Sequence, residues 1–211
     1  MPNIGFVNQT SLGSFLGALA SAEHAHGTLA AAAVAAAMGA SLLVKAAALP
    51  KTKSDSTEDR IVLVESAAAL RIVQEQLMET IETETAVKVF AARAMPEGSQ
   101  VQRRERAAAL QVALRAAAEV PLEVMRLSVA ALTQAERVAA RGTQAASRNI
   151  QLAVGLLRVA VDAARVNLES KLSTLTDVSY TTSVIEEISR LSEEATSKSR
   201  AAEVLIQLPP A

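Results

Sequence analysis

Both histidines of this 211-residue chain lie in one short polar segment, SAEHAHG, which runs from Ser21 to Gly27. Imidazole is the side chain whose ordinary pKa lies nearest neutrality, so His24 and His26 are the first candidates for proton transfer. Thr28 follows at the position of a helix N-cap. A loop that brings titratable groups to the positive end of a helix is suited to anion binding or catalysis.

The same two histidines also have plainer interpretations. They can be solvent-exposed or hydrogen-bonded loop residues, and with Glu23 they can form part of a metal site. Two loop histidines and one carboxylate are weak evidence for a metal ion, so we predict no metal site.

The helix that follows this loop is the element around which the chain is organised. From Thr28 to Val44 it carries no charged residue and consists mostly of alanine. Its small side chains, with Gly39 and Ser41, permit neighbouring helices to approach to the near end of the usual interaxial range of about 8–10 Å. We therefore expect it at the centre of a tightly packed bundle. A membrane span is disfavoured because alanine gains little on transfer to lipid.

The composition favours an all-α fold. Hydrophobic residues make up 50% of the chain but aromatic residues only 2%, so many small aliphatic side chains must fill the core. The β-branched and aromatic runs that strands need are missing. A chain of this length forms one domain more readily than two. We predict a single helical domain over residues 1–211, built as a multi-helix, up-and-down-like bundle.

Proline, glycine and polar clusters divide the chain after the central helix. We predict a loop over residues 50–57, with Asp55 or Ser56 capping a long helix that ends near residues 96–99. The segments that follow are a helix from Ser99 to Ala140 with a kink or restart at Pro121, a C-cap at Gly142, a helix over 144–176, a loop over 177–183 and a final amphipathic helix over about 184–205. Within 144–176, helical spacing marks an apolar stripe of Leu152, Leu156, Val159, Ala163, Val166 and Leu172.

The charge balance and the absence of cysteine argue against several classes of partner. With 21 basic and 22 acidic residues the formal net charge is −1, which gives no global field for nucleic acid or an anionic membrane. Without cysteine the chain is compatible with a reducing compartment, and its first residues lack the basic region of a secretory signal. We therefore expect a cytoplasmic protein that binds neither nucleic acid nor membrane.

Several segments carry a family resemblance. They are FLGALAS over residues 15–21, the alanine-rich run over 31–37 followed by Met38-Gly39-Ala40, and Ala118-Glu119-Val120-Pro121-Leu122. In this order they resemble the formiminotetrahydrofolate cyclodeaminase and methenyltetrahydrofolate cyclohydrolase family, over roughly residues 11–180. The resemblance implies an all-α bundle that assembles as a homodimer. It also implies a tetrahydrofolate derivative as substrate or ligand, with no covalently bound cofactor.

The resemblance further implies which residues carry the chemistry. Glu82 falls on the family's acidic position, and Asn149 stands where the family has the aspartate of a Ser-Asp pair. Opening a methenyl bridge requires one group to accept a proton from the attacking water and another to protonate the ring nitrogen. An asparagine cannot accept that proton at neutral pH. We therefore hypothesise that His24 or His26 has taken over the role of general base.

A second set of residues is implied for ligand binding. Only Gly27 remains of the family's glycine-rich loop, next to Thr28, and Asn167 falls on a family asparagine. Lys45 and Lys53 can hold the glutamate tail of a folate, because lysines bind such tails as point charges. The alternative for both lysines is an ordinary solvated loop.

These observations predict an enzyme that hydrolyses the methenyl bridge of a one-carbon-substituted tetrahydrofolate or a related pterin. Two alternatives stay open. The chain can be a diverged family member that acts as a pterin-binding or subunit-interaction protein, or an enzyme with a new substrate in the same cleft.

Overall fold

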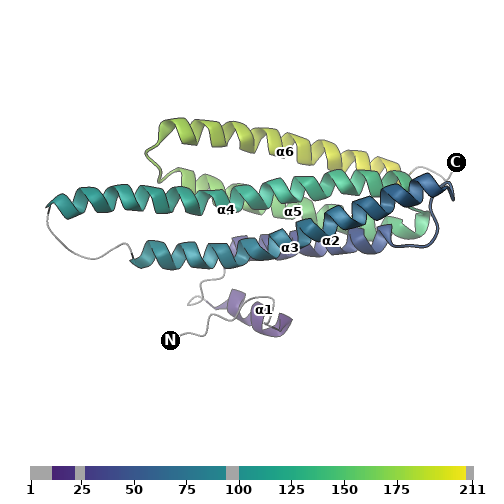
Figure 1. Cartoon of the computed structure of the whole chain (residues 1–211), viewed down its shortest axis with the longest axis horizontal. Helices are drawn as coiled ribbons and strands as arrows, with labels where there is room; N and C mark the ends of the chain where they lie inside the picture. Colours follow the sequence, from purple (N-terminus) through teal and green to yellow (C-terminus); the bar gives the residue numbers. More distant parts are fainter. Residues whose placement is uncertain (1–10, 22–26, 94–99, 208–211) are drawn as a thin grey trace.

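Five long helices run side by side and form the body of the protein (Figure 1). This computed structural model describes residues 11–21, 27–93 and 100–207. The elements are α1 (Leu12–Ala20), α2 (Thr28–Ala47), α3 (Thr57–Arg93), α4 (Gln100–Arg141), the short 3₁₀ helix η2 (Gln144–Ala146), α5 (Ser147–Leu172) and α6 (Val178–Gln207). Within the described ranges there is no strand, and the predicted all-α, up-and-down-like bundle is confirmed.

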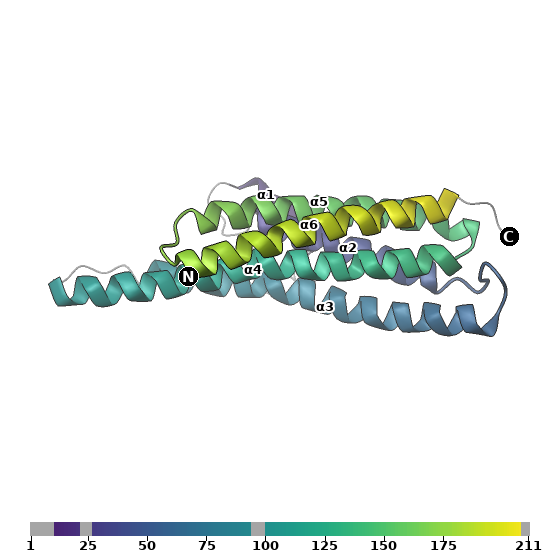
Figure 2. The same cartoon turned by 90° about the horizontal axis from the view of Figure 1, so that it is seen from above.

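The alanine-rich α2 lies in the interior, as the sequence predicts. It packs against α3, α4 and α5, while α6 covers α4 and α5. Ala30, Ala36 and Ala40 of α2 are completely buried, at 0% exposure. The short α1 lies outside the five long helices, and α3 and α4 extend furthest along the bundle (Figures 1 and 2). Of α1, Phe15 is buried and joins the hydrophobic core.

α2 and α5 approach each other closely at Gly39. A Cβ atom built on Gly39 would lie 2.9 Å from Leu157 Cγ and 3.0 Å from the backbone oxygen of Ala153. Only a residue without a side chain leaves room for this contact. The position of Gly39 therefore sets the distance between the two helices.

Three helix ends test the capping predictions. Ser56 caps α3, because its Oγ accepts a hydrogen bond from the Asp59 N–H at 3.1 Å. Gly142 closes α4, where its N–H donates to the Val138 oxygen at 2.7 Å. At the start of α2 the N-cap is Gly27 rather than Thr28, and no side chain caps this helix. Thr28 is instead its first helical residue.

Of the kink or restart predicted at Pro121, the restart does not occur. α4 continues through Pro121 as one helix from Gln100 to Arg141. Proline removes one backbone hydrogen bond from a helix interior, and this cost is offset where packing holds the helix on both sides. Val120 and Leu122, the neighbours of Pro121, are both buried in the core.

The predicted loop over residues 177–183 is also wrong, since α6 begins at Val178. The polar run DVSYTTS looks like a loop, but its first residue is a helix cap. Asp177 Oδ1 accepts a hydrogen bond from the Tyr180 N–H at 3.0 Å. The predicted C-terminal helix thus starts six residues earlier than the expected Val184.

Most of the predicted apolar stripe of α5 does not face the core, and of its six residues only Leu172 is buried. Leu152, Val159 and Val166 are 57%, 61% and 58% exposed. The buried face of α5 is instead formed by Ile150, Ala153, Val154, Leu157, Ala160, Val161, Ala164, Leu168 and Leu172. This helix therefore has two apolar faces, and its periodicity alone could not tell which one is buried. We call Leu152, Leu156, Val159, Ala163 and Val166 the α5 stripe.

One described helix is long and apolar enough to cross a membrane. It is α2, with 20 residues and a mean hydropathy of 1.8, and 56% of its most apolar window is buried inside the bundle. Burial of this kind is what a core helix of a bundle requires.

We expect Gly39→Ala to destabilise the protein by about 1–3 kcal/mol, because even a methyl group overpacks the contact with Leu157. Urea unfolding measures the change. Gly155→Ala in α5 is the matched control, since a Cβ there meets no atom within 4 Å, and alanine should stabilise a helix interior by about 0.5–1 kcal/mol. Equal stabilities of the two variants would contradict the close contact at Gly39.

Candidate functional site

The structure divides the predicted site residues between the two ends of α2. Arg60 of α3 donates to the backbone oxygens of Ala47 and Leu49 at 3.2 and 2.7 Å, so α3 starts where α2 ends. At its other end, α2 meets α5 near Thr28 and Asn167. We call these the Lys53 end and the Gly27 end of the bundle.

At the Gly27 end, the start of α2 is tied to α5 by a direct contact. Asn167 Nδ2 donates a hydrogen bond to Thr28 Oγ1 at 3.3 Å. Asn167 Oδ1 is buried and has no hydrogen-bond partner among the described residues. Gly27 offers no side chain to the first N–H groups of α2, and no acidic residue lies in the first turn. Among the described residues no side chain caps this end of the 20-residue helix, which carries a positive partial charge.

Glu82 lies on α3 toward the same end. One turn before it, Met78 shares a groove with Val34 and Met38 of α2. A rise of 1.5 Å per residue carries α3 about 6 Å further to Glu82, in the direction of Gly27. Glu82 is partly buried.

The two histidines cannot be placed in the same way. His24 and His26 belong to residues 22–26, which lie outside the described residues. In the sequence His26 directly precedes Gly27, the N-cap of α2. Their role in proton transfer stays a prediction.

The remaining predicted residues lie at the Lys53 end. Lys45 is exposed in the last turn of α2, and Asn149 is partly exposed in the first turn of α5. Lys53 is held by its backbone, whose N–H donates to the Arg141 oxygen at 2.7 Å. Asn149 and Asn167 are 18 residues apart on α5, which is about 27 Å along the helix axis. One protomer therefore does not bring Asn149 or the two lysines next to Thr28 and Asn167.

Between the two ends, an apolar groove of about 610 Å³ opens along α2. Phe15 of α1, Met38 of α2, Met78 of α3 and Leu156 of α5 are among the residues that line it. Its polar side chains are Ser41 and Gln74, and the Ser41 hydroxyl is already bonded to the Ala37 oxygen at 2.7 Å. The groove offers few groups to orient a polar ring.

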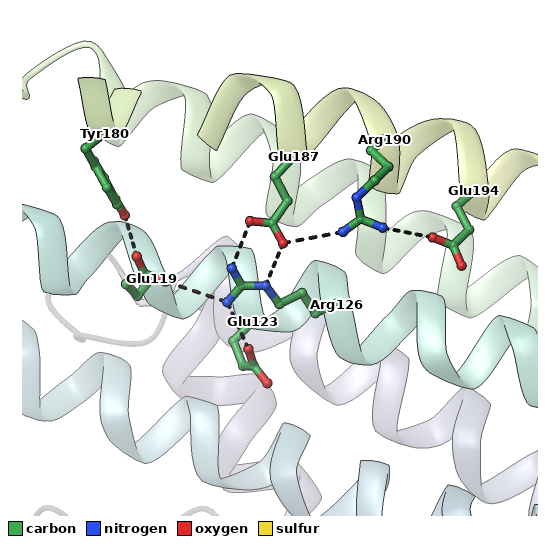
Figure 3. A network of polar contacts seen from close by, with 7 residues as sticks. All are labelled: Glu119, Glu123, Arg126, Tyr180, Glu187, Arg190 and Glu194. Carbon is green, nitrogen blue, oxygen red and sulfur yellow. Dashed lines mark hydrogen bonds and ion pairs between the residues drawn. The ribbon is translucent and has the colours of Figure 1, made fainter. Parts of the chain in front are cut away.

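A polar cluster between α4 and α6 was not predicted from the sequence (Figure 3). Arg126 of α4 donates to both oxygens of Glu187 of α6, from Nε at 2.8 Å and from Nη2 at 2.9 Å. Its Nη1 lies 3.4 Å from Glu123 and 3.7 Å from Glu119. The hydrogen bond from Arg126 lowers the pKa of Glu187 below its usual range. Such bidentate pairs fix the relative position of two helices.

Tyr180 extends this cluster toward the start of α6. Its hydroxyl donates to Glu119 Oε1 at 2.8 Å, and the Arg115 guanidinium lies 4.2 Å from the ring centroid. Burial, together with the hydrogen bond to Glu119, raises the pKa of Tyr180 above its usual value. Because its charged groups are paired with one another, we interpret the cluster as the attachment of α6 rather than as a catalytic centre.

The partners that join α4 to α6 in this cluster are 61 residues apart in the sequence, as Tyr180 and Glu119 are. The only local signal was the helical spacing of Glu119, Glu123 and Arg126, which is also typical of a solvated helix face. Among the described residues, no group of three His, Cys, Asp or Glu side chains is arranged to hold a metal ion.

Comparisons with known proteins give one family and one fold. The family described as formiminotransferase-cyclodeaminase matches residues 11–190. Among solved structures, the chain is similar to formiminotetrahydrofolate cyclodeaminase from Thermotoga maritima, with a TM-score of 0.85 and 19% sequence identity over 95% of this chain and 98% of that chain. A search of the curated proteins finds no match.

The Arg126–Glu187 pair predicts a pH-dependent contribution to stability. A lowered carboxyl pKa means that the pair stabilises the fold above the ordinary glutamate pKa and loses this effect as the pH falls through the folded-state value. At pH 7 we expect Glu187→Gln to reduce the free energy of unfolding by about 0.5–1 kcal/mol, since both groups are partly exposed and solvent screens them.

Urea unfolding at pH 7 and at pH 3 measures this contribution. The difference between wild type and Glu187→Gln should shrink at the lower pH. Glu186→Gln, a change at the exposed neighbouring residue, should have little effect at either pH. A deficit of Glu187→Gln that stays constant with pH would rule out the ion pair as its cause.

Proposed function

Because the chain belongs to the formiminotransferase-cyclodeaminase family, we propose that it is an enzyme that hydrolyses the methenyl bridge of a one-carbon-substituted tetrahydrofolate or a related pterin. The family match and the likeness in fold support a folate-related cyclodeaminase or cyclohydrolase. The finer assignment rests mainly on one contact, between Thr28 and Asn167. It joins the open N-terminus of α2 to an amide side chain, directly after the segment with both histidines.

The chemistry follows from the groups at the Gly27 end. Water must attack an amidinium-like carbon, a base must take up its proton, and a second group must protonate the ring nitrogen as its bond to that carbon breaks. His24 or His26 supplies that base, and Glu82 is the acidic partner on α3. The positive N-terminal end of α2 binds a carboxylate or carbonyl oxygen of the ligand, and Asn167 hydrogen-bonds its polar ring. We place this reaction in the cytoplasm.

We further propose that two copies of the chain assemble as a homodimer through the α5 stripe. Leu152, Val159 and Val166 expose more than half of their surface in one protomer. Contiguous apolar surface of this kind usually marks an interaction site. The same surface continues onto α2, where Met38 is 52% exposed.

The ends of the stripe suggest an antiparallel arrangement. Asn149 and Asn167 are 18 residues apart, which is five helical turns, so they lie on the same face of α5. A two-fold axis through the α5 stripe at the level of residue 158, midway between them along the helix, brings Asn149 of one copy opposite Asn167 of the other. The ligand-binding lysine Lys45 then approaches the Gly27 end of the second copy. In this arrangement each site draws on both protomers.

The charged residues at the edge of the stripe fit the same arrangement. Arg148 lies at one end of α5 and Glu169 at the other, and both are exposed. An antiparallel pairing about this axis brings these opposite charges toward each other across the interface. A parallel pairing would bring like charges together instead.

Val159→Glu should convert the dimer to a monomer, because it buries a charge at the centre of the interface without a partner. Light scattering after size exclusion gives the molar mass. Ile72→Glu is the control, since Ile72 is similarly exposed at 57% but lies on α3. A wild-type protein that stays monomeric at every concentration would contradict the proposed homodimer.

The histidine hypothesis is tested with His24→Ala and His26→Ala. The loss of methenyltetrahydrofolate absorbance measures turnover. Replacement of the histidine that acts as general base should lower turnover by about 10²- to 10⁴-fold, with folate binding and thermal stability nearly unchanged. The other histidine variant is the matched control, and the wild-type rate should rise with pH near the histidine pKa.

Asn149→Asp provides the complementary measurement. If the family mechanism is only dormant, restoring the acidic residue should increase turnover. Full activity in both histidine variants would contradict a relocated base. A wild-type protein that binds no folate, measured by calorimetry, would contradict the proposed function itself.

A further inference from the structure

The short helix α1 carries two large apolar side chains that are exposed in one protomer. Leu12 and Leu16 are 67% and 55% exposed, and they lie on one face of the helix because they are four residues apart. Phe15 is the only residue of α1 that is buried. Isolated helices shorter than about 12–15 residues are marginally stable in water, and α1 has nine residues. This helix therefore needs more packing than one protomer gives it.

The apolar groove of about 610 Å³ adjoins the exposed leucines. Leu12 and Phe15 line it from α1, Met38 lines it from α2 and Leu152 from α5. Met38 and Leu152 are themselves 52% and 57% exposed, and no charged residue is among the described residues that line the groove. Since α1 lies outside the five long helices (Figures 1 and 2), its leucines and the groove form one apolar surface on the outside of the bundle. Contiguous apolar surface of this kind usually marks an interaction site.

This surface is continuous with the α5 stripe, because Leu152 and Leu156 belong to both. The groove also lies near the level of the proposed two-fold axis. A Cβ atom on Gly39 would lie 2.9 Å from Leu157 Cγ, so Gly39 and the neighbouring Met38 lie within about one helical turn of residue 158 along the bundle.

The symmetry of the proposed homodimer determines what the groove faces. A two-fold axis that lies in the interface and runs perpendicular to α5 reverses the direction of the helices. It leaves α2 of both copies on the same side of the paired α5 helices. The two grooves therefore face each other across the axis, with Met38 of each copy close to it. Because α1 lines the groove, it lies on the surface that is turned toward the second copy.

We propose that α1 is part of the homodimer interface, where Leu12 and Leu16 of each copy pack against the groove of the second copy. This inference rests on the homodimer proposed above and adds the element that closes its interface. Packing against the second copy removes the leucines from water and gives α1 the burial that it lacks in one protomer. Each contact of an isologous interface occurs twice, so four leucines become buried.

The double variant Leu12→Ser/Leu16→Ser tests the proposal on the full chain. Sedimentation equilibrium should give a dimer dissociation constant about 10²-fold or more above that of wild type, because four leucines lose their burial. Ile61→Ser/Val64→Ser is the matched control, since these residues are similarly exposed, at 53% and 58%, and lie on α3 outside the groove. This control should dimerise like wild type.

Introduced cysteines locate the groove relative to the axis, because the chain has no cysteine of its own. A short bis-maleimide should cross-link two copies of Met38→Cys. Ile72→Cys is the control, since Ile72 is similarly exposed, at 57%, but lies on α3 outside the groove. It should not be cross-linked.

Two further measurements separate the interface from packing within one protomer. In the background of Val159→Glu, which should be monomeric, Leu12→Ser/Leu16→Ser should leave the melting temperature unchanged, since both leucines are exposed in one protomer. The apolar dye ANS should bind to monomeric Val159→Glu, whose groove is open, and much less to the wild-type dimer.

The outcomes distinguish this inference from the homodimer itself. A wild type that is monomeric at every concentration would overturn both. A dimeric wild type whose dissociation constant is unchanged in the double leucine variant would overturn this inference alone, as would Met38→Cys that cross-links no better than Ile72→Cys. A lower melting temperature of the leucine variant in the monomeric background would assign the leucines to packing within one protomer. Equal binding of ANS by wild type and Val159→Glu would leave the groove open to a small apolar ligand in the dimer, which also contradicts the inference.

Discussion

The approach of α2 to α5 at Gly39 is the constraint on which the rest of the structure depends. With 2% aromatic residues, the protein cannot fill a wide space between helices, so its helices must lie close together. A glycine facing Leu157, with alanines along the same helix, makes this possible. Close packing gains dispersion contacts that small side chains cannot supply over longer distances. The other helices then take positions around this pair.

Polar interactions fix what the small-residue core leaves undetermined. Alanine surfaces are nearly smooth, so they specify the register between helices less strongly than large interlocking side chains do. The bidentate pair between Arg126 and Glu187 sets the register of α6 on α4, and the hydrogen bond between Asn167 and Thr28 does the same for α5 on α2. The second of these contacts is also part of the site that we propose.

Much of the fold could be predicted from the sequence, because the signals are local. Ser56 caps the start of α3 and Gly142 the end of α4, as their residue types suggest, and the alanine run of α2 is buried. The predictions were wrong where packing between helices, rather than the local sequence, determines where a helix ends and which face is buried. Pro121 is tolerated within a packed helix, and Asp177 starts a helix in a polar run that resembles a loop. On α5 two apolar faces compete, and only the neighbouring helices determine that Leu157 is buried while Val159 is exposed. The candidate site was harder to predict from the sequence than the fold, since its residues lie far apart in the sequence and, in one protomer, at opposite ends of the bundle.

The pairing of α2 with α5 has a consequence for how the chain is made. α2 ends at Ala47 and its main partner begins at Ser147, so about a hundred residues are synthesised between them. At a synthesis rate of about 5–20 residues per second, about 5–20 s pass between the synthesis of α2 and that of α5. During this interval α3 and α4 can cover only part of α2. The aliphatic inner face of α2 therefore stays partly uncovered until α5 has been synthesised.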